Sequence, residues 1–156
     1  MSEQPIKPID VFFSYAHEDE GLRRKLENHL SILRREGFIR SWHDRDIKAG
    51  DEWKKKIDEH LETASIILLL ISADFLASDY CYDIEMKRAI ARHEAGEARV
   101  IPIILRYTAG WEKTKFHKLQ ALPRDGQPVK QWSDRDKAFA DIAKEIRIVA
   151  EKLKNT

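Results

Sequence analysis

Five residues of this sequence have side chains suited to binding or polarising a ligand, and they fall in three polar stretches that each follow an apolar run. Tyr15 lies in the first stretch, Trp42 and Arg45 in the second, and Tyr80 and Glu85 in the third. A carboxylate stabilises nearby positive charge, an aromatic face packs on planar groups, and a guanidinium pairs with phosphate oxygens. These groups form one site only if the fold brings the three stretches together.

Apolar runs of strand type alternate along the chain with stretches of helical periodicity. Residues 65–72 are apolar almost throughout rather than alternating, which is typical of a strand buried on both faces of a parallel sheet. Leucines recur at helical spacing between residues 22 and 33. We expect strands at residues 9–14, 38–42, 65–72, 99–105 and 128–132, the fourth weakened by Pro102, and helices at residues 22–33, 53–64, 80–93 and 139–153.

This alternation predicts an α/β protein with a flavodoxin-like three-layer fold. The expected five-stranded parallel sheet has the order 2-1-3-4-5 and carries helices on both faces. Ligands of such sheets bind beyond the carboxyl ends of the strands at the topological switch point, here between the first and third strands. Residues 14–18, 42–51 and 72–85 leave the first three strands and meet there. Topology alone therefore places the five side chains around one cleft.

Several common ligand-binding and catalytic signatures are absent from the sequence. It contains neither of the glycine-rich nucleotide loops, G-x-x-x-x-G-K-[ST] and G-x-G-x-x-G, and no G-x-S-x-G elbow. The histidines never fall at metal-ligand spacing, and one cysteine, Cys81, does not make a structural zinc site. The net charge of +1 provides no general field for nucleic acid or an acidic membrane. We expect no metal, no cofactor and no nucleic-acid partner.

The length of 156 residues fits one domain, which we place at residues 9–154 after a disordered lead at residues 1–8. The N-terminus lacks the apolar stretch of a signal peptide. The longest apolar run, residues 66–71, is far shorter than the ~20 residues that cross a bilayer. One cysteine excludes an intrachain disulfide, which suits a reducing compartment. We expect a cytoplasmic protein without membrane contact.

Three blocks of the sequence resemble the motifs of bacterial TIR (Toll/interleukin-1 receptor) domains. Residues 12–16 (FFSYA) are similar to F-x-S-Y/H-A, and residues 42–50 (WHDRDIKAG) contain D-R-x-I-x-x-G. Residues 72–86 are similar to S-x-x-[FY]-x-x-S-x-[WY]-C-x-x-E-L. Each block alone is a weak signal, but the three occur in the family's order and on the expected elements. The resemblance covers residues 9–105, and the last third matches only in outline.

The resemblance implies an enzyme that cleaves NAD+ at the nicotinamide–ribose bond, with NAD+ as its substrate. It implies that Glu85 is catalytic, because a glutamate at the start of the third helix has that role in NAD-cleaving members. The common spacing is Cys-x-x-Glu, whereas this chain has Cys-x-x-x-Glu, so we expect an entry one residue longer and keep Asp83 as the alternative acid. The substrate-binding residues that we expect are Phe12, Ser14, Tyr15, Trp42, Arg45 and Tyr80.

The resemblance also implies partners and a biological setting. TIR domains associate with one another, here through residues 43–51, and the setting would be bacterial antiphage defence signalling or, alternatively, virulence. A sensor or effector would be a separate protein. The alternative function is a non-catalytic TIR–TIR interaction module.

Several site residues also have a plain structural interpretation. Phe12 and Trp42 are as well suited to core packing as to ligand contact, and Arg45 lies between two aspartates with which it pairs in that alternative. Cys81 is expected to be a small buried hydrophobe.

Overall fold

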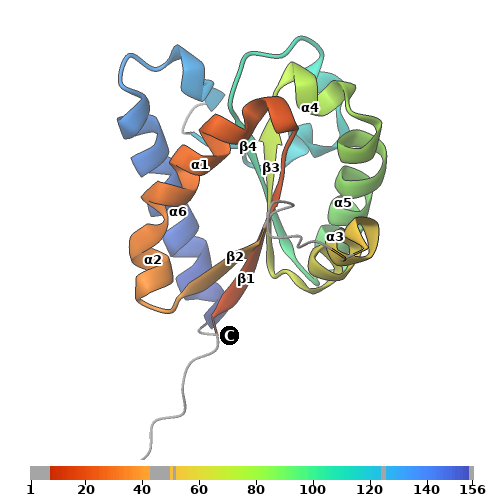
Figure 1. The fold of residues 1–156 in the computed structure, drawn as a ribbon. Helices are drawn as coiled ribbons and strands as arrows, with labels where there is room; N and C mark the ends of the chain where they lie inside the picture. The colour runs from red at the N-terminus through yellow and green to blue at the C-terminus, as the bar shows by residue number, and fades with distance from the viewer. Residues whose placement is uncertain (1–7, 43–49, 51, 124–125, 155–156) are drawn as a thin grey trace, which may run out of the picture.

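The computed structural model describes residues 8–42, 50, 52–123 and 126–154. Its centre is a parallel sheet with the order β2-β1-β3-β4 (Figure 1). The strands are β1 (Ile9–Ser14), β2 (Ile39–Trp42), β3 (Ile66–Ile71) and β4 (Arg99–Ile104). The chain runs from β1 outward to β2 and then returns past β1 to β3, so the switch point lies between β1 and β3, as expected.

Helices cover both faces of the sheet, which explains the continuous apolar run of β3. All six of its residues, IILLLI, are buried. One face carries α1 (Glu20–His29), α2 (Ser31–Arg35) and α6 (Arg135–Lys154) (Figure 1). The other carries α3 (Trp53–Thr63), α4 (Ala73–Ala77), the π-helix η3 (Tyr80–Met86) and α5 (Lys87–Glu94). The short 3₁₀ helices are η1 (His17–Asp19), η4 (Trp111–Lys113), η5 (Lys115–Lys118) and η7 (Val129–Gln131).

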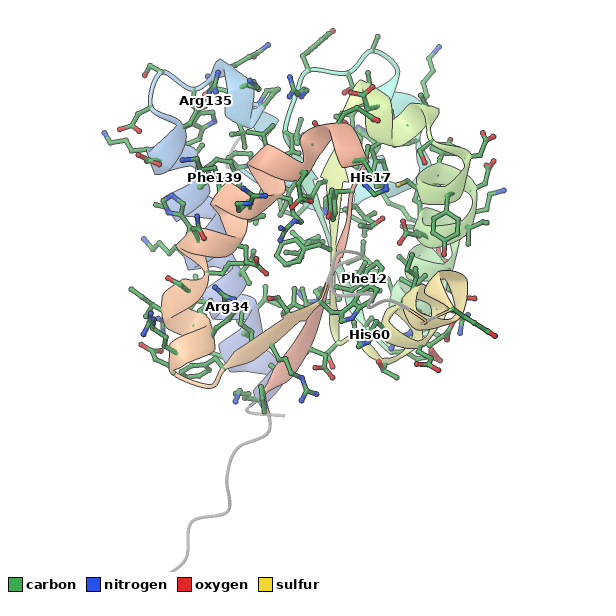
Figure 2. The ribbon with its side chains drawn as sticks, in the orientation of Figure 1. Phe12, His17, Arg34, His60, Arg135 and Phe139 are labelled. Atoms are coloured by element: carbon green, nitrogen blue, oxygen red, sulfur yellow. The ribbon has the colours of Figure 1, made fainter. Side chains whose placement is uncertain are left out.

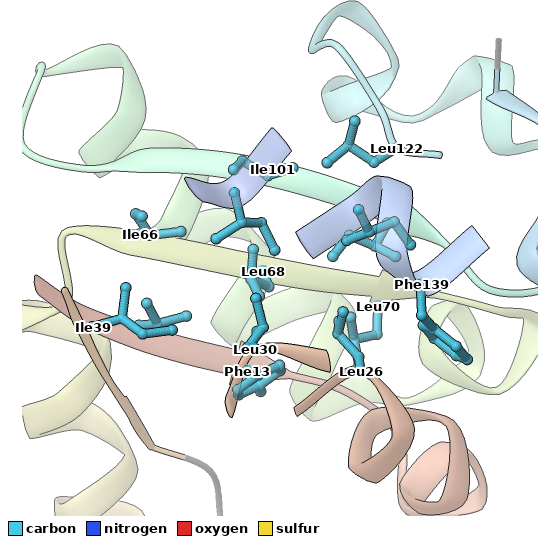
Figure 3. Packing of buried hydrophobic residues seen from close by; sticks show 14 of the residues in the cluster. Phe13, Leu26, Leu30, Ile39, Ile66, Leu68, Leu70, Ile101, Leu122 and Phe139 are labelled. Carbon is cyan, nitrogen blue, oxygen red and sulfur yellow. The ribbon is translucent and has the colours of Figure 1, made fainter. Parts of the chain in front are cut away.

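The two faces of the sheet have separate hydrophobic cores. Alternation along β1 sends Phe13 and Tyr15 into the core under α1 and α6, and sends Phe12 into the core under α3 and α5. Figure 3 shows the first core, in which Phe13, Leu68 and Phe139 come from β1, β3 and α6. Each β1 side chain therefore belongs to one face only, which matters for the site below.

The expected fifth strand at residues 128–132 is wrong. Val129–Gln131 forms a 3₁₀ helix, and the sheet of the described residues has four strands. Leu122 takes the place beside β4 instead, through one isolated parallel bridge to Ile103. Its amide donates to Pro102 O at 2.9 Å, and its carbonyl accepts from Ile104 N at 2.8 Å. Pro128 directly precedes this 3₁₀ helix, and its φ of −55° suits the start of a helical turn.

Pro102 is compatible with β4 because β4 is the edge strand. Its carbonyl points outward to Leu122, and the N and C=O of one strand residue point to the same side. The missing N–H therefore faces away from β3 and removes no bond of the sheet.

The helix expected at residues 22–33 is interrupted at Leu30, where α1 ends before α2 begins. The expected lead at residues 1–8 falls almost wholly on residues outside the described part.

Candidate active site

A pocket of about 490 Å³ opens at the carboxyl end of the sheet, on the face covered by α3 and η3. Its walls come from the end of β1 and the segment that follows, from α3, and from the segment between α4 and α5. It therefore lies where the topology predicted a ligand site. The lining residues are Phe12, Phe13, Tyr15, Ala16, His17, Glu18, Ile57, Ser78, Tyr80, Cys81 and Glu85.

Glu85 lies at the wall of this pocket and is only 5% exposed. Its Oε1 accepts a hydrogen bond from Ser14 Oγ, with 3.2 Å between the two oxygens. Ser14 is the last residue of β1 and is itself buried. A buried carboxylate held by a β1 hydroxyl is thus presented to the cavity rather than to bulk solvent. Asp83, the alternative acid, is exposed and lies 3.9 Å from Lys87 Nζ, so the geometry favours Glu85.

The extra residue between Cys81 and Glu85 is accommodated by the π-helix. A π-helical turn holds more residues than an α-helical turn, so a single inserted residue widens one turn without changing the phase of the helix that follows. Tyr80–Met86 is π-helical, and α5 continues directly from Lys87. Cys81 and Glu85 are both buried against β1 as a result. The longer entry expected from the sequence is this π-helical segment.

The backbone carbonyl and the side chain of Tyr15 make contacts on opposite faces of the sheet. Its carbonyl oxygen lies on the pocket side, 3.5 Å from Cys81 Sγ, which donates to it. Its ring lies on the opposite face, where the hydroxyl donates to Glu20 Oε2 at 2.5 Å and the Arg23 guanidinium lies 5.5 Å from the ring centroid. The ring of Tyr15 is therefore enclosed by α1, and the backbone is the part of Tyr15 that is directed toward Cys81 and Glu85.

Tyr80 and Phe12 supply the aromatic surface of the pocket. Burial, together with the charge of Glu85, raises the pKa of the Tyr80 hydroxyl above its ordinary value. Tyr80 therefore remains a neutral phenol near the carboxylate throughout the physiological range. Phe12 is 1% exposed. It belongs to the core under α3 and also lines the pocket, so core packing and ligand contact are both compatible with its position.

Trp42 packs between two rings and does not line the pocket. Its indole stacks on Phe12 with 5.5 Å between centroids and on His60 with 4.2 Å, at interplanar angles of 13° and 12°. Figure 2 shows Phe12 and His60 on the same side of the sheet, toward α3. These two stacking contacts hold the Trp42 indole against β1 and α3 at the end of β2. Arg45 lies outside the described residues.

Seven of the lining residues were not among the expected site residues, namely Phe13, Ala16, His17, Glu18, Ile57, Ser78 and Cys81. His17 and Glu18 are exposed at the end of β1, and Figure 2 shows His17 at the end of that strand. Ile57 comes from the buried face of α3, and Ser78 precedes η3. His17 and Glu18 lie within residues 14–18, which were expected to meet at the switch point, so the topological argument contained the signal for them. Nothing in the sequence distinguishes Ile57 from other buried residues of α3.

One buried carboxylate holds the segment beside the pocket. Asp19 accepts from Ser72 Oγ at 2.5 Å and from Arg106 Nε at 3.0 Å. The same Ser72 oxygen caps α4 by accepting from Phe75 N at 3.1 Å. Asp19 therefore joins the exits of β1, β3 and β4, and this set of bonds maintains the shape of the switch point.

Metal and membrane features are absent from the part of the chain that the structure describes. No group of three or more His, Cys, Asp or Glu side chains there is arranged to hold a metal ion. Within the same residues, no helix is both long enough and apolar enough to span a bilayer.

The fold and the site together define an α/β domain of flavodoxin-like topology with an acidic pocket at its switch point. The model of the TIR domain family matches residues 11–144, so the chain belongs to the TIR domain family. The fold neighbours agree with this, because 88% of the chain superposes on 99% of a TIR domain of the activated Roq1 resistosome, with a TM-score of 0.63 and 17% identity. At that identity the likeness concerns the fold alone.

Two curated relatives are similar in sequence. The uncharacterized protein y4lF of Sinorhizobium fredii is 58% identical over 146 residues, which are 94% of this chain and 45% of that protein. The 2' cyclic ADP-D-ribose synthase BtTIR of Bacteroides thetaiotaomicron is 33% identical over 123 residues, 77% of this chain and 39% of that protein. The chain thus spans less than half the length of either relative.

Proposed function

We propose that this chain cleaves NAD+ at the bond between nicotinamide and ribose. The observation that carries the proposal is the buried carboxylate of Glu85, held by Ser14 at the wall of a pocket large enough for a nucleotide portion of the substrate. The Bacteroides relative, named as a cyclic ADP-ribose synthase, supports the same class of reaction.

One carboxylate is sufficient for this chemistry because the leaving group of NAD+ is already cationic. As the bond from the ribose carbon to the ring nitrogen breaks, the bonding electron pair goes to nitrogen and nicotinamide departs neutral. No acid has to protonate it, unlike the leaving group of an ordinary glycoside. Positive charge develops on the ribose, and Glu85 stabilises that charge more strongly in the transition state than in the ground state.

The remaining pocket residues bind and orient the substrate. Phe12 and Tyr80 offer aromatic surface to the nicotinamide ring, and Ser14 fixes the carboxylate oxygen that faces the ribose. Tyr15 contributes to the wall of the pocket through its backbone. Arg45 is proposed to pair with the pyrophosphate, and Trp42 supports the site by anchoring the start of residues 43–51.

The product depends on which nucleophile reaches the ribosyl cation. Water gives ADP-ribose and a proton, whereas attack by a hydroxyl or by adenine of the same molecule gives a cyclic ADP-ribose. We propose that such a product serves as a signal, in bacterial antiphage defence, and that a separate sensor or effector protein completes the system. The name of the Bacteroides relative favours a cyclic product.

Self-association is part of the proposal. We propose that residues 43–51, which follow Trp42 at the end of β2, contact a neighbouring copy of the domain. If this contact completes the cleft, NAD+ cleavage per molecule rises with protein concentration or with a crowding agent. A specific activity that is flat over a hundredfold range of concentration would contradict this part of the proposal.

The decisive experiment follows nicotinamide release from NAD+ by chromatography for the wild type and Glu85→Gln. This substitution keeps the shape of the side chain and removes its charge, so we expect a loss of about 10²-fold or more. Asp83→Asn is the matched control, because it removes an exposed carboxylate two residues away, and it should remain active. Equal activity of Glu85→Gln and the wild type would overturn the site. Inactivity of the wild type under all clustering conditions would favour an interaction module.

A further inference from the structure

A second hollow of about 1020 Å³ lies on the other face of the sheet, also at its carboxyl end. We call it the α1–α6 groove. It is bounded by Glu18 and the first turns of α1, by Arg106 after β4, and by residues 130–139 at the start of α6. Glu18 lines both this groove and the Glu85 pocket, so the segment after β1 separates the two cavities.

The α1–α6 groove gathers cationic side chains that lack acidic partners. Lys25, Lys130 and Arg135 line it, and none of them forms an ion pair with any carboxylate among the described residues. Arg106 is the fourth cation and is paired with Asp19. The charge of Arg135, with smaller contributions from burial and from Arg106, lowers the pKa of Lys130 below its ordinary value, and the charge of Asp19 opposes this shift only in part. The cations are therefore close enough to repel one another.

Three carboxylates also line the α1–α6 groove, those of Glu18, Asp134 and Asp136, and the two aspartates are engaged in other contacts. Asp134 Oδ1 accepts from Asp136 N at 3.0 Å and from Lys137 N at 3.3 Å, so it caps α6. Asp136 Oδ1 lies 3.4 Å from His29 Nε2. The start of α6 is thus already capped by the chain itself, and it is the unpaired cations, rather than the helix end, that favour an anion here.

An aromatic ring lines the same groove. Trp132 is partly exposed, and its Nε1 donates to Gln127 O at 3.0 Å, which fixes the plane of the indole. Phe139 also lines the groove and belongs to the core against which Trp132 packs; Figure 2 labels Arg135 and Phe139 on this side of the molecule. A fixed indole face beside three cations combines a surface for a planar base with charges for phosphate groups.

We propose that the α1–α6 groove binds a nucleoside diphosphate group, with its phosphates on Lys130 and Arg135 and its base against Trp132. This site is separate from the Glu85 pocket, and its existence does not depend on NAD+ cleavage. Because both cavities include Glu18, a ligand in the groove contacts the segment that also borders Glu85.

Isothermal titration calorimetry with ADP tests the assignment. We expect wild-type protein to bind ADP, and the double variant Lys130→Gln/Arg135→Gln to bind about tenfold more weakly or worse, because two charge-assisted contacts are lost. Inorganic pyrophosphate and adenosine are the parallel probes. Each should bind more weakly than ADP, since each offers only one half of the interactions. Pyrophosphate binding as tightly as ADP would overturn the nucleotide assignment and leave a simple anion site.

Control variants make the result specific to the α1–α6 groove. Lys144→Gln removes the same charge from an exposed position of the same helix and should leave ADP affinity unchanged. Lys25→Gln changes an exposed side chain of α1 and should weaken binding about threefold, so the proposal stays testable if the double variant unfolds. No binding of ADP at low salt, or an equal loss in Lys144→Gln, would overturn it.

Discussion

Ser14 and Glu85 are 71 positions apart in the sequence, yet the Ser14 hydroxyl donates a hydrogen bond to the Glu85 carboxylate at 3.2 Å. Ser14 ends β1 and Glu85 lies in η3, so this bond joins the first strand to the π-helix. Both side chains are buried, with exposed fractions of 1% and 5%. A hydrogen bond to a charged group in such a place restricts the direction in which the carboxylate points.

Replacing Ser14 with Ala should reduce NAD+ cleavage by about tenfold, a smaller loss than that for Glu85→Gln. A hydrogen bond to a charged group contributes about 1.5–3 kcal/mol, but the carboxylate itself remains. The measurement is kcat for nicotinamide release, with far-ultraviolet circular dichroism to verify the fold. Ser65→Ala is the control, because Ser65 lies at the opposite end of β3. An unchanged kcat in Ser14→Ala would show that the bond does not orient Glu85 for the reaction.

Deleting Ile84 should convert the π-helix into an ordinary α-helix while leaving α5 in phase. Ile84 is 43% exposed, so little packing is lost, and the deletion restores the Cys-x-x-Glu spacing. We expect NAD+ cleavage to remain within about threefold of the wild type, since a π-bulge is an inserted residue that its helix accommodates locally.

Deleting Ala91 is the matched test. It removes an exposed residue from α5, and rotates the rest of that helix by about 100°. Thermal unfolding should show a large loss of stability for the Ala91 deletion and a small one for the Ile84 deletion. The opposite order would refute this account of η3.

Arg92→Met should destabilise the protein by about 3 kcal/mol or more. The Arg92 guanidinium is buried and donates at 2.7 Å to the carbonyls of Leu61 and Ala64, at the end of α3, so its loss leaves two acceptors unsatisfied. Arg88→Met, one helical turn earlier, removes an exposed ion pair with Glu62 and should have a much smaller effect, because solvent screens such a pair. Urea unfolding at neutral pH measures both. Equal losses in the two variants would contradict the assigned role of Arg92.

His93 should make the protein less stable as the pH falls below about 6.5. Burial, assisted by the charge of Arg99, lowers the pKa of His93 below its ordinary value of 6.5, and its Nδ1 accepts from Val100 N at 3.1 Å. In the window between the folded and unfolded pKa values, the unfolded chain binds a proton that the folded chain does not. The free energy of unfolding due to His93 is therefore fully present above pH 6.5 and decreases below it. Urea titrations from pH 7.5 to 5 should give a shallower decline for His93→Gln. An identical slope in both proteins would show that His93 does not contribute.

The sequence predicted the parts of this structure that depend on periodicity and order. The uniformly apolar β3 implied a covered parallel sheet, and the alternation of strands and helices located the switch point. The fifth strand was wrong because a single bridge at Leu122, which carries no periodic signal, takes its place. The sequence identified Tyr15 and Trp42 as site residues but did not predict the direction in which their side chains point. Strand alternation and the ring of His60, 18 residues further along, decide where those two side chains point.

The alternation of β1 has a consequence for the integrity of the site. Parallel pairs with both β2 and β3 lock the strand in place, for instance at Phe12, which pairs with Trp42 and Ile67. A slip by one residue would bring a phenyl ring, Phe13, opposite the carboxylate and carry its hydroxyl partner to the far layer. The contact between Ser14 and Glu85 therefore depends on the register of β1, so we expect it to be lost in the same unfolding transition as the sheet.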